Sequence, residues 1–255
     1  MHREWKHDVS ADWLMTRRHF LCASDIRNLI ADYKRIKDGK IELMQAQQFA
    51  KVYGSKQVTE VDTSSYGPMA RGHIMEPHAV DEYNAWRGTD FRWWDDKIIT
   101  NGELGFSPDA LDIPQVPGVK AIMREADGKL EAVGGMVDAP TAMLEIKSYE
   151  AGNHYQRKMA FAAGHPLEER WQIACGMAVC NAIEEGTVLF YAPQCDDMFE
   201  VTYLRDDLEE ELGAIREIEA MWRDFSIKAD RIRSQGTNET EAHIYDLYLL
   251  DEMTN

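Results

Sequence analysis

The stretch MLEIK, at residues 143–147, is the most informative part of this sequence, and it lies inside an apolar segment over 141–147. Its length and apolar content predict a β-strand. Alternate side chains of a strand point to the same face, so Glu145 and Lys147 share one face. A carboxylate and an ammonium beside buried apolar side chains cost free energy unless they are paired or bind a metal ion. The stretch therefore predicts a core strand that also carries a site.

Hydrophobic periodicity predicts the elements on either side of this strand. Before it, we expect helices over 25–37, 41–53 and 69–86, strands over 91–99 and 104–107, and a hairpin formed by 119–124 and 130–134 around Asp127-Gly128. After it, we expect helices over 154–163 and 167–183, strands over 187–192 and 199–204, and a long helix to about Ile232. Helix starts are indicated by Ser24, by Pro166, and by Asp206 or Asp207.

The order of these elements indicates the fold class. Helices come first, then a run of strands, two helices, two strands and a last helix, which predicts one mixed central β-sheet flanked by helices, an α/β or α+β sandwich. No linker composition interrupts the first 233 residues. We therefore expect one domain over 1–233, followed by a polar C-terminal tail over 234–255.

Composition limits the possible classes of protein. The chain has 255 residues, 44% of them hydrophobic, which is enough for a core, and no apolar run reaches the roughly 20 residues of a membrane helix. The N-terminus does not resemble a signal peptide, so we expect a cytoplasmic location and no membrane partner. The four cysteines show no zinc or iron–sulfur spacing. A net charge of −17 argues against nucleic acid, although a binding site is local.

Two further acidic residues lie where they can join the strand. Asp109 follows the predicted strand 104–107 in the motif Ser107-Pro108-Asp109, and Glu76 belongs to the predicted helix 69–86. Two or three carboxylates suit a hard cation such as Mg²⁺ or Mn²⁺. Such a metal lowers the pKa of a bound water, and Lys147 beside that water stabilises the extra negative charge of a transition state. This is the chemistry of phosphodiester hydrolysis.

Each motif also has a simpler interpretation. Glu-x-Lys in a strand is more often an ion pair or a solvated face, and Ser-Pro-Asp is more often a turn. Their order and their predicted placement on helix, strand and strand favour the joint interpretation. Basic residues near the motifs are candidates for a DNA groove and, about as well, for a solvated face: Lys56, Arg71, Lys120, Arg124, Arg157 and Lys158.

The order Glu, Pro-Asp, Glu-x-Lys resembles the PD-(D/E)xK nuclease superfamily. The surrounding sequence, over about residues 10–205, is similar to the lambda exonuclease or YqaJ-like viral recombinase branch of this superfamily. The matching positions are Trp13, Arg17 and Ala23-Ser24, then Gly72, Glu76-Pro77 and Tyr83, then 107–111, and finally Gln172 and Met177. The resemblance implies a restriction-endonuclease-like core and a metal-dependent exonuclease acting on linear double-stranded DNA ends, 5′→3′, in phage-type recombination by single-strand annealing.

The resemblance also implies roles for particular residues. The metal ligands are Glu76, Asp109, Glu145 and the carbonyl of Ile146. Lys147 is the catalytic lysine, and Gln172 places the lysine or the attacking water. Residues matching the pocket for the 5′-phosphate of the DNA end are Arg17, Ser24 and Ser107, with Arg157 a candidate for a further arginine. The family implies a ring-shaped trimer around DNA and a single-strand annealing protein as partner.

The sequence departs from the family pattern in three places. Asp109 and Glu145 are further apart than the usual short hairpin allows, so we place an extra hairpin between them. Asp138 is a rival for the aspartate role, and the context of Asp109 favours Asp109. Glu169 stands where the family commonly has a tyrosine, three residues before Gln172.

Two other functions compete with the exonuclease. One keeps the fold and makes the protein an endonuclease or junction resolvase, which would attack circular DNA. The other is a non-catalytic acidic DNA mimic or regulator, which the net charge of −17 supports. A mimic, however, has no need of a strand-borne Glu-x-Lys beside Ser-Pro-Asp.

Overall fold

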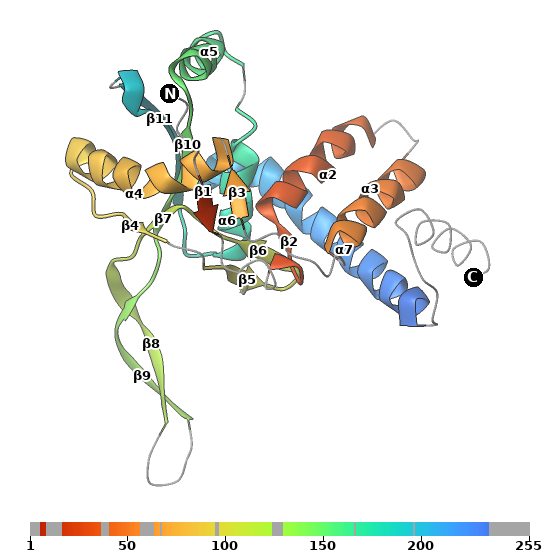
Figure 1. Cartoon of the computed structure of the whole chain (residues 1–255). Helices are drawn as coiled ribbons and strands as arrows, with labels where there is room; N and C mark the ends of the chain where they lie inside the picture. The colour runs from red at the N-terminus through yellow and green to blue at the C-terminus, as the bar shows by residue number, and fades with distance from the viewer. Residues whose placement is uncertain are drawn as a thin grey trace.

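A five-stranded mixed sheet forms the centre of the computed structural model (Figure 1). Its order is β12 (Asp197–Leu204), β11 (Glu185–Ala192), β10 (Ala142–Ser148), β7 (Ala110–Asp112) and β4 (Arg92–Trp93). β10 and β11 are parallel, and every other neighbouring pair is antiparallel. The structure describes residues 6–8, 17–36, 41–56, 64–66, 68–94, 97–123, 130–165, 167–195 and 197–234.

Three smaller sheets accompany the central one. β2 (Leu21–Cys22) is parallel to β6 (Leu104–Phe106), which is antiparallel to β5 (Ile99–Asn101). β1 (Lys6–Asp8) pairs with β3 (Ser64–Tyr66). β8 (Gln115–Met123) and β9 (Leu130–Asp138) form an antiparallel hairpin that extends away from the rest of the molecule (Figure 1).

Helices cover both faces of the central sheet. They are α2 (Ala23–Ile36), α3 (Ile41–Lys56), α4 (Pro68–Arg87), α5 (Ala151–Ala162), α6 (Arg170–Val179) and α7 (Glu209–Ser234), with 3-10 turns η1 (Pro193–Cys195) and η2 (Arg205–Leu208). α2, α3 and α7 lie together at one end of the molecule in Figure 1. Within the described part of the chain, no helix has the length and apolarity needed to cross a membrane.

β10 is buried on both faces, which explains its sequence. Leu144 and Ile146 belong to one apolar cluster, together with Ala79, Val80 and Tyr83 of α4. Met143 belongs to the larger cluster, which includes Ile173 and Met177 of α6. The period of two thus assigns alternate residues to the α4 side and the α6 side. Glu145 and Lys147 fall on the α6 side with Met143.

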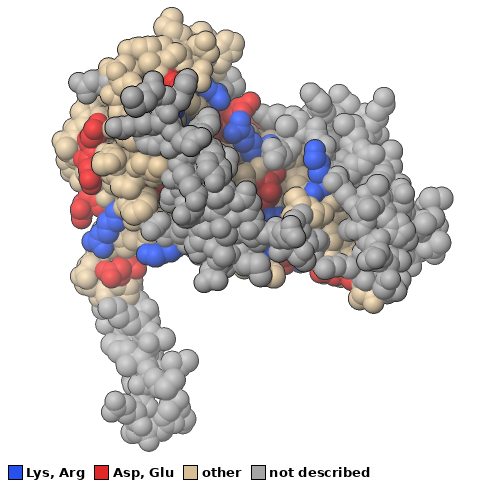
Figure 2. Space-filling model, in the orientation of Figure 1, with Lys and Arg blue, Asp and Glu red and all other residues tan. Residues whose placement is uncertain are grey.

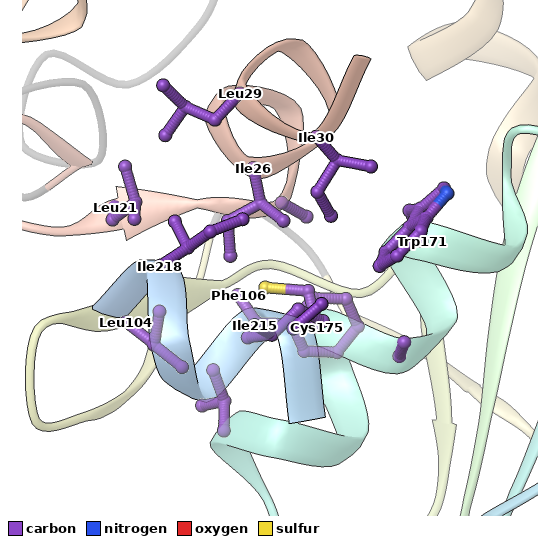
Figure 3. Close-up of a cluster of buried hydrophobic side chains, with 14 of the residues drawn as sticks. Leu21, Ile26, Leu29, Ile30, Leu104, Phe106, Trp171, Cys175, Ile215 and Ile218 are labelled. Carbon is purple, nitrogen blue, oxygen red and sulfur yellow. The ribbon is translucent and has the colours of Figure 1, made fainter. Parts of the chain in front are cut away.

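The larger core joins the second sheet to the helices. Figure 3 shows side chains from β2, α2, β6, α6 and α7 converging on one apolar cluster. Those labelled there are Leu21, Ile26, Leu29, Ile30, Leu104, Phe106, Trp171, Cys175, Ile215 and Ile218. Burial of these side chains connects the α2–α3–α7 end to the sheet that carries the candidate site.

Most predicted elements are confirmed, but three local predictions are wrong. The strand predicted over 91–99 is two strands in different sheets, because β4 pairs with β7 while β5 pairs with β6. The helix predicted over 167–183 covers only Arg170–Val179. It ends there because the Arg205 side chain donates to the carbonyls of Met177, Cys180 and Ile183, at 2.8–3.1 Å, and replaces further helical hydrogen bonds.

The third wrong prediction is Ser24 as an N-cap. Ser24 is the second residue of α2, and Asp25, the third, accepts the backbone N–H of Cys22, the residue before the helix, at 2.9 Å. Lys56 donates to Asp25 at 2.8 Å and to the Phe20 carbonyl at 2.7 Å, so it connects α3 to the start of α2. The Lys56 ammonium is therefore engaged within the fold.

Some predictions lie outside the described residues. These are the Asp127-Gly128 turn, Pro166 as a helix start, Trp13, and the tail beyond residue 234. The hairpin itself is confirmed, and both of its strands extend further from the turn than predicted.

Packing between α6 and β10 predicts a difference between two helical glycines. A Cβ at Gly176 would lie 2.7 Å from Met143 Sδ and 2.7 Å from Phe106 Cζ, whereas a Cβ at Gly213 meets nothing within 4 Å. We expect Gly176→Ala to lower the free energy of unfolding by ~1–3 kcal/mol. Gly213→Ala should raise it by ~0.5–1 kcal/mol. Urea denaturation of both variants checks this, and equal stability of the two would contradict the packing described.

Candidate active site

The central feature of the site is the contact between Asp109 and β10. β7 pairs with β10 only as far as Ala110 opposite Leu144, and Asp109 is the residue just before β7. The Asp109 carboxylate accepts the Ile146 backbone N–H at 2.5 Å, in the position where a longer β7 would have continued the ladder. The Asp109 carbonyl accepts the Trp94 N–H at 3.0 Å, which holds this residue in place. A side chain thus replaces a strand at this edge of β10.

A second set of contacts is built on Glu145, whose residue is 5% exposed. Lys147 Nζ donates to Glu145 Oε1 at 2.5 Å, as alternation along the strand predicts. Gln172 Nε2, from α6, donates to the same oxygen at 2.8 Å. The Gln172 Oε1 atom is buried and has no hydrogen-bond partner in the described part of the chain. Glu145 therefore connects the strand to the helix, and one polar atom beside it is left unsatisfied.

Electrostatic interactions among Asp109, Glu145 and Lys147 shift the pKa values of Asp109 and Lys147. Burial, together with the charges of Glu145 and Glu76, raises the pKa of Asp109 well above its usual value, against the opposing effects of Lys147 and the Ile146 N–H. Burial lowers the pKa of Lys147, but the charges of Glu145 and Asp109 and the hydrogen bond that Lys147 donates to Glu145 outweigh burial and raise the pKa overall. The lysine is therefore a cation held between two carboxyl groups.

Glu76 is close enough to act on Asp109, but it has a partner of its own. Its Oε1 lies 3.2 Å from His73 Nδ1, one helical turn earlier on α4. Among the residues that the structure describes, no three His, Cys, Asp or Glu side chains are gathered in a group able to hold a metal ion. The structure thus places Asp109 and Glu145 against Ile146 and Lys147, and the charge of Glu76 acts on Asp109 from α4.

The chemistry of the atoms present fits a hard divalent cation. Asp109 and Glu145 supply carboxylate oxygens, the donors that Mg²⁺ and Mn²⁺ prefer. The N–H and C=O of one residue leave a strand on the same edge, so the Ile146 carbonyl faces the edge where Asp109 lies. The unsatisfied Gln172 Oε1 is a further oxygen on the residue that donates to Glu145, and it would be available to such a cation's hydration shell.

The residues expected to bind a 5′-phosphate fall into two places. Arg17 Nη2 donates to Ser24 Oγ at 3.0 Å. Ser24 follows β2 and Ser107 follows β6, and these strands are parallel, so both serines lie at the same edge of the second sheet. Ser107 Oγ donates to the Lys97 carbonyl at 2.7 Å. Arg157 belongs to α5, where its nearest acidic group is Glu169.

Sequence reasoning did not predict that two charged residues near the site, Glu169 and Arg71, are buried. Glu169 was noted only as a departure from the family, and its spacing from Gln172, one helical turn, was the signal that both share a face of α6. Arg71 is buried on α4 and donates to the Ser148 carbonyl at 2.9 Å, next to Lys147. The rival Asp138 is exposed at the end of β9, paired with Gln115.

Comparison with solved structures identifies similar folds. An alkaline exonuclease from Laribacter hongkongensis has a TM-score of 0.52 and 20% identity, covering 88% of this chain and 100% of that chain. The same protein in complex with dAMP gives the same values. A phage-related exonuclease from Haemophilus somnus 129PT has a TM-score of 0.45 and 14% identity, covering 85% and 87%. Comparison with curated proteins by sequence gives no match.

These findings define the class of protein. The mixed sheet flanked by helices is the restriction-endonuclease-like fold, as the sequence predicted. The model of the YqaJ-like viral recombinase domain matches residues 12–183, more than half of the chain. The chain belongs to this family, so the resemblance inferred from its motifs is confirmed.

The raised pKa of Asp109 predicts how the stability of the metal-free protein depends on pH. Above the ordinary aspartate pKa of about 4, the unfolded state has released a proton that folded Asp109 still holds. The free energy of unfolding therefore falls as the pH rises from there to the raised folded pKa. Asp109→Asn has no carboxyl group to titrate, so its free energy of unfolding does not fall in this way. We expect it to be more stable than wild type near the raised pKa of folded Asp109.

The measurement is thermal melting of both proteins in chelator across this pH range. The advantage of Asp109→Asn over wild type should shrink toward zero as the pH falls to about 4. Asp224→Asn, at an exposed position on α7, is the matched control. If the difference in stability between Asp109→Asn and wild type stays constant with pH, folding does not raise the pKa of the Asp109 carboxyl group.

Proposed function

We propose that this protein is a divalent-metal-dependent exonuclease that hydrolyses phosphodiester bonds of linear double-stranded DNA. The observation that carries the proposal is the meeting of Asp109, Glu145, Lys147 and Gln172 at one edge of β10. The family and the fold shared with an alkaline exonuclease support it. Metal-assisted phosphodiester hydrolysis needs a pair of acids and a nearby cation. Here three separate elements supply the acidic pair, a lysine and an amide.

Asp109, Glu145 and the Ile146 carbonyl are the proposed ligands of Mg²⁺ or Mn²⁺, with Glu76 as a third carboxylate from α4. When bound, such an ion supplies an acidified water and neutralises phosphate charge. Burial, followed by the charges of Glu145 and Glu76, raises the pKa of Asp109, so a second negative charge is unfavourable there without a cation. A dication relieves this repulsion, so the site is more favourable with the ion than without it.

Lys147 is the proposed catalytic lysine. Its raised pKa keeps it protonated, and its hydrogen bond to Glu145 fixes the ammonium beside the candidate ligands. From there it donates to the negative charge that develops when water attacks a phosphate. Gln172 donates its amide to Glu145, which leaves its Oε1 atom to accept a hydrogen bond from the attacking water and orient it.

The end-binding pocket is proposed to consist of Arg17, Ser24 and Ser107. Ser24 and Ser107 gather at the edge of the second sheet, and Ser107 is two residues before Asp109. Binding of a terminal 5′-phosphate there would set the distance to the scissile bond and produce 5′→3′ polarity. The trimeric ring, the annealing partner and the role in phage-type recombination remain predictions from the family.

Charge on the surface is compatible with DNA in a limited area. The chain carries a net charge of −17, and Figure 2 shows Lys and Arg in several separate places with Asp and Glu between them. A local group of basic side chains near the site is sufficient for a short contact with a DNA end. Affinity should therefore depend on few phosphates and fall gently with salt.

Replacement of the lysine tests the proposed chemistry. We expect Lys147→Ala to lower the rate of digestion of linear duplex DNA in Mg²⁺ by at least about 10²-fold, because a preorganised charge is lost. Lys51→Ala, at an exposed position on α3, should digest like wild type. Excess chelator should stop digestion by wild type and by Lys51→Ala. Digestion by a folded Lys147→Ala protein at the wild-type rate would remove the mechanism.

The form of the DNA end tests the mode of attack. Linear duplexes with a 5′-phosphate should be digested faster than those with a 5′-hydroxyl, because the terminal charge places the scissile bond. Arg17→Gln should reduce this preference more than it reduces the rate on hydroxyl ends. Circular duplex, which has no end, should stay intact. Cleavage of the circle would point to an endonuclease, and no cleavage of any DNA with Mg²⁺ or Mn²⁺ would point to a non-catalytic protein.

A further inference from the structure

Glu169 is a buried carboxylate that the proposed chemistry does not use. Its residue is 1% exposed, and its Oε2 atom has no hydrogen-bond partner within the described part of the chain. Its Oε1 atom lies 3.6 Å from Arg157 Nη2. A buried carboxylate without full hydrogen bonding costs free energy. A site-related role would explain why such a group is present.

The position of Glu169 connects it to the candidate active site. It is the residue before α6, one helical turn ahead of Gln172, and so both side chains lie on the same side of that helix. Gln172 Nε2 in turn donates to Glu145 Oε1 at 2.8 Å, and the same oxygen accepts from Lys147. Glu169 therefore lies on the side of α6 from which Gln172 contacts β10.

Arg157 is the cation that Glu169 contacts. It comes from α5, the helix that follows β10 directly, and its guanidinium lies 5.9 Å from the centroid of the Tyr149 ring. Its side chain is 36% exposed. A guanidinium has five N–H donors, and one carboxylate at 3.6 Å engages only part of them. The side chain is thus anchored from the protein side while part of it faces solvent.

We propose that Glu169 is a positioning residue that holds Arg157 beside the candidate active site, so that the Arg157 guanidinium binds a phosphate of the DNA strand being cut. Glu169 and the Tyr149 ring restrict where the long arginine side chain can point, which lowers the entropy lost when phosphate binds. Guanidinium is well suited to this ligand, because its planar fork matches the oxygens of a phosphate. The inference rests on the proposed function, since it assigns the phosphate to a DNA substrate.

The test compares Glu169→Gln, Arg157→Gln and the double variant with wild type. The matched control is Glu168→Gln, which removes an exposed carboxylate one residue away that pairs with Arg27 instead. Binding of a short 5′-phosphorylated duplex is measured in chelator by fluorescence anisotropy, and KM and kcat are measured in Mg²⁺. Thermal melting confirms that each variant is folded.

We expect Glu169→Gln and Arg157→Gln each to weaken binding and raise KM by about tenfold, as loss of a charge-assisted contact does, with little change in kcat. The double variant should be no weaker than either single variant, because the two residues act as one unit. Glu168→Gln should behave like wild type. Additive losses, or a Glu169→Gln protein that loses kcat with unchanged KM, would overturn the role assigned to Glu169.

The same measurements separate this inference from the proposed function. If wild type binds the duplex with the expected coupling but cuts nothing in Mg²⁺ or Mn²⁺, the nuclease proposal fails and the phosphate-positioning role stands. If wild type cuts DNA and Glu169→Gln binds and cuts like Glu168→Gln, only the positioning role fails. If Glu169→Gln does not fold, Arg157→Gln alone must raise KM, and an unchanged KM overturns the inference. Absence of any DNA binding by wild type overturns both.

Discussion

One hydrogen bond organises the candidate site: the Ile146 N–H donates to the carboxylate of Asp109 where β7 stops. Had β7 continued, a backbone carbonyl would have satisfied this N–H and no acid would face β10. Because β7 is short, a side chain takes over the ladder bond and brings its carboxyl group next to Glu145. The Ile146 carbonyl shares that edge, since both polar groups of one residue leave the strand on the same side. The early end of β7 thus brings the Asp109 carboxyl group and the Ile146 carbonyl to the same edge of β10.

The double burial of β10 explains why this place is polar on one side only. Leu144 and Ile146 pack against α4, while Glu145 points to α6, where Gln172 meets it. The apolar cluster stabilises the strand, and that stability offsets the cost of crowding charged groups on the other side. Natural proteins concentrate such unfavourable groups where they work, so stability and chemistry compete at this strand. The same reasoning applies to Glu169, which is buried and only partly satisfied.

Net charge and local charge point to different functions, and the local arrangement favours the proposed nuclease. The net charge of −17 suits an acidic mimic of DNA. A mimic, however, displays its carboxylates to solvent, whereas Glu145 and Glu169 are buried behind the surface. Buried acids beside a partly buried lysine have no value for mimicry and cost stability. They fit an active centre of the YqaJ-like viral recombinase family, to which the chain belongs.

The sequence alone determined the strand 141–147, the shared face of Glu145 and Lys147, the extra hairpin and the order of motifs, because alternation and turn chemistry act between near neighbours. Only the tertiary structure decided that Asp109 accepts from Ile146, that Gln172 reaches Glu145 and that Glu169 contacts Arg157. It also decided the end of α6, where Arg205 supplies the bonds. These contacts join residues far apart in the chain, and local periodicity carries no information about such distances.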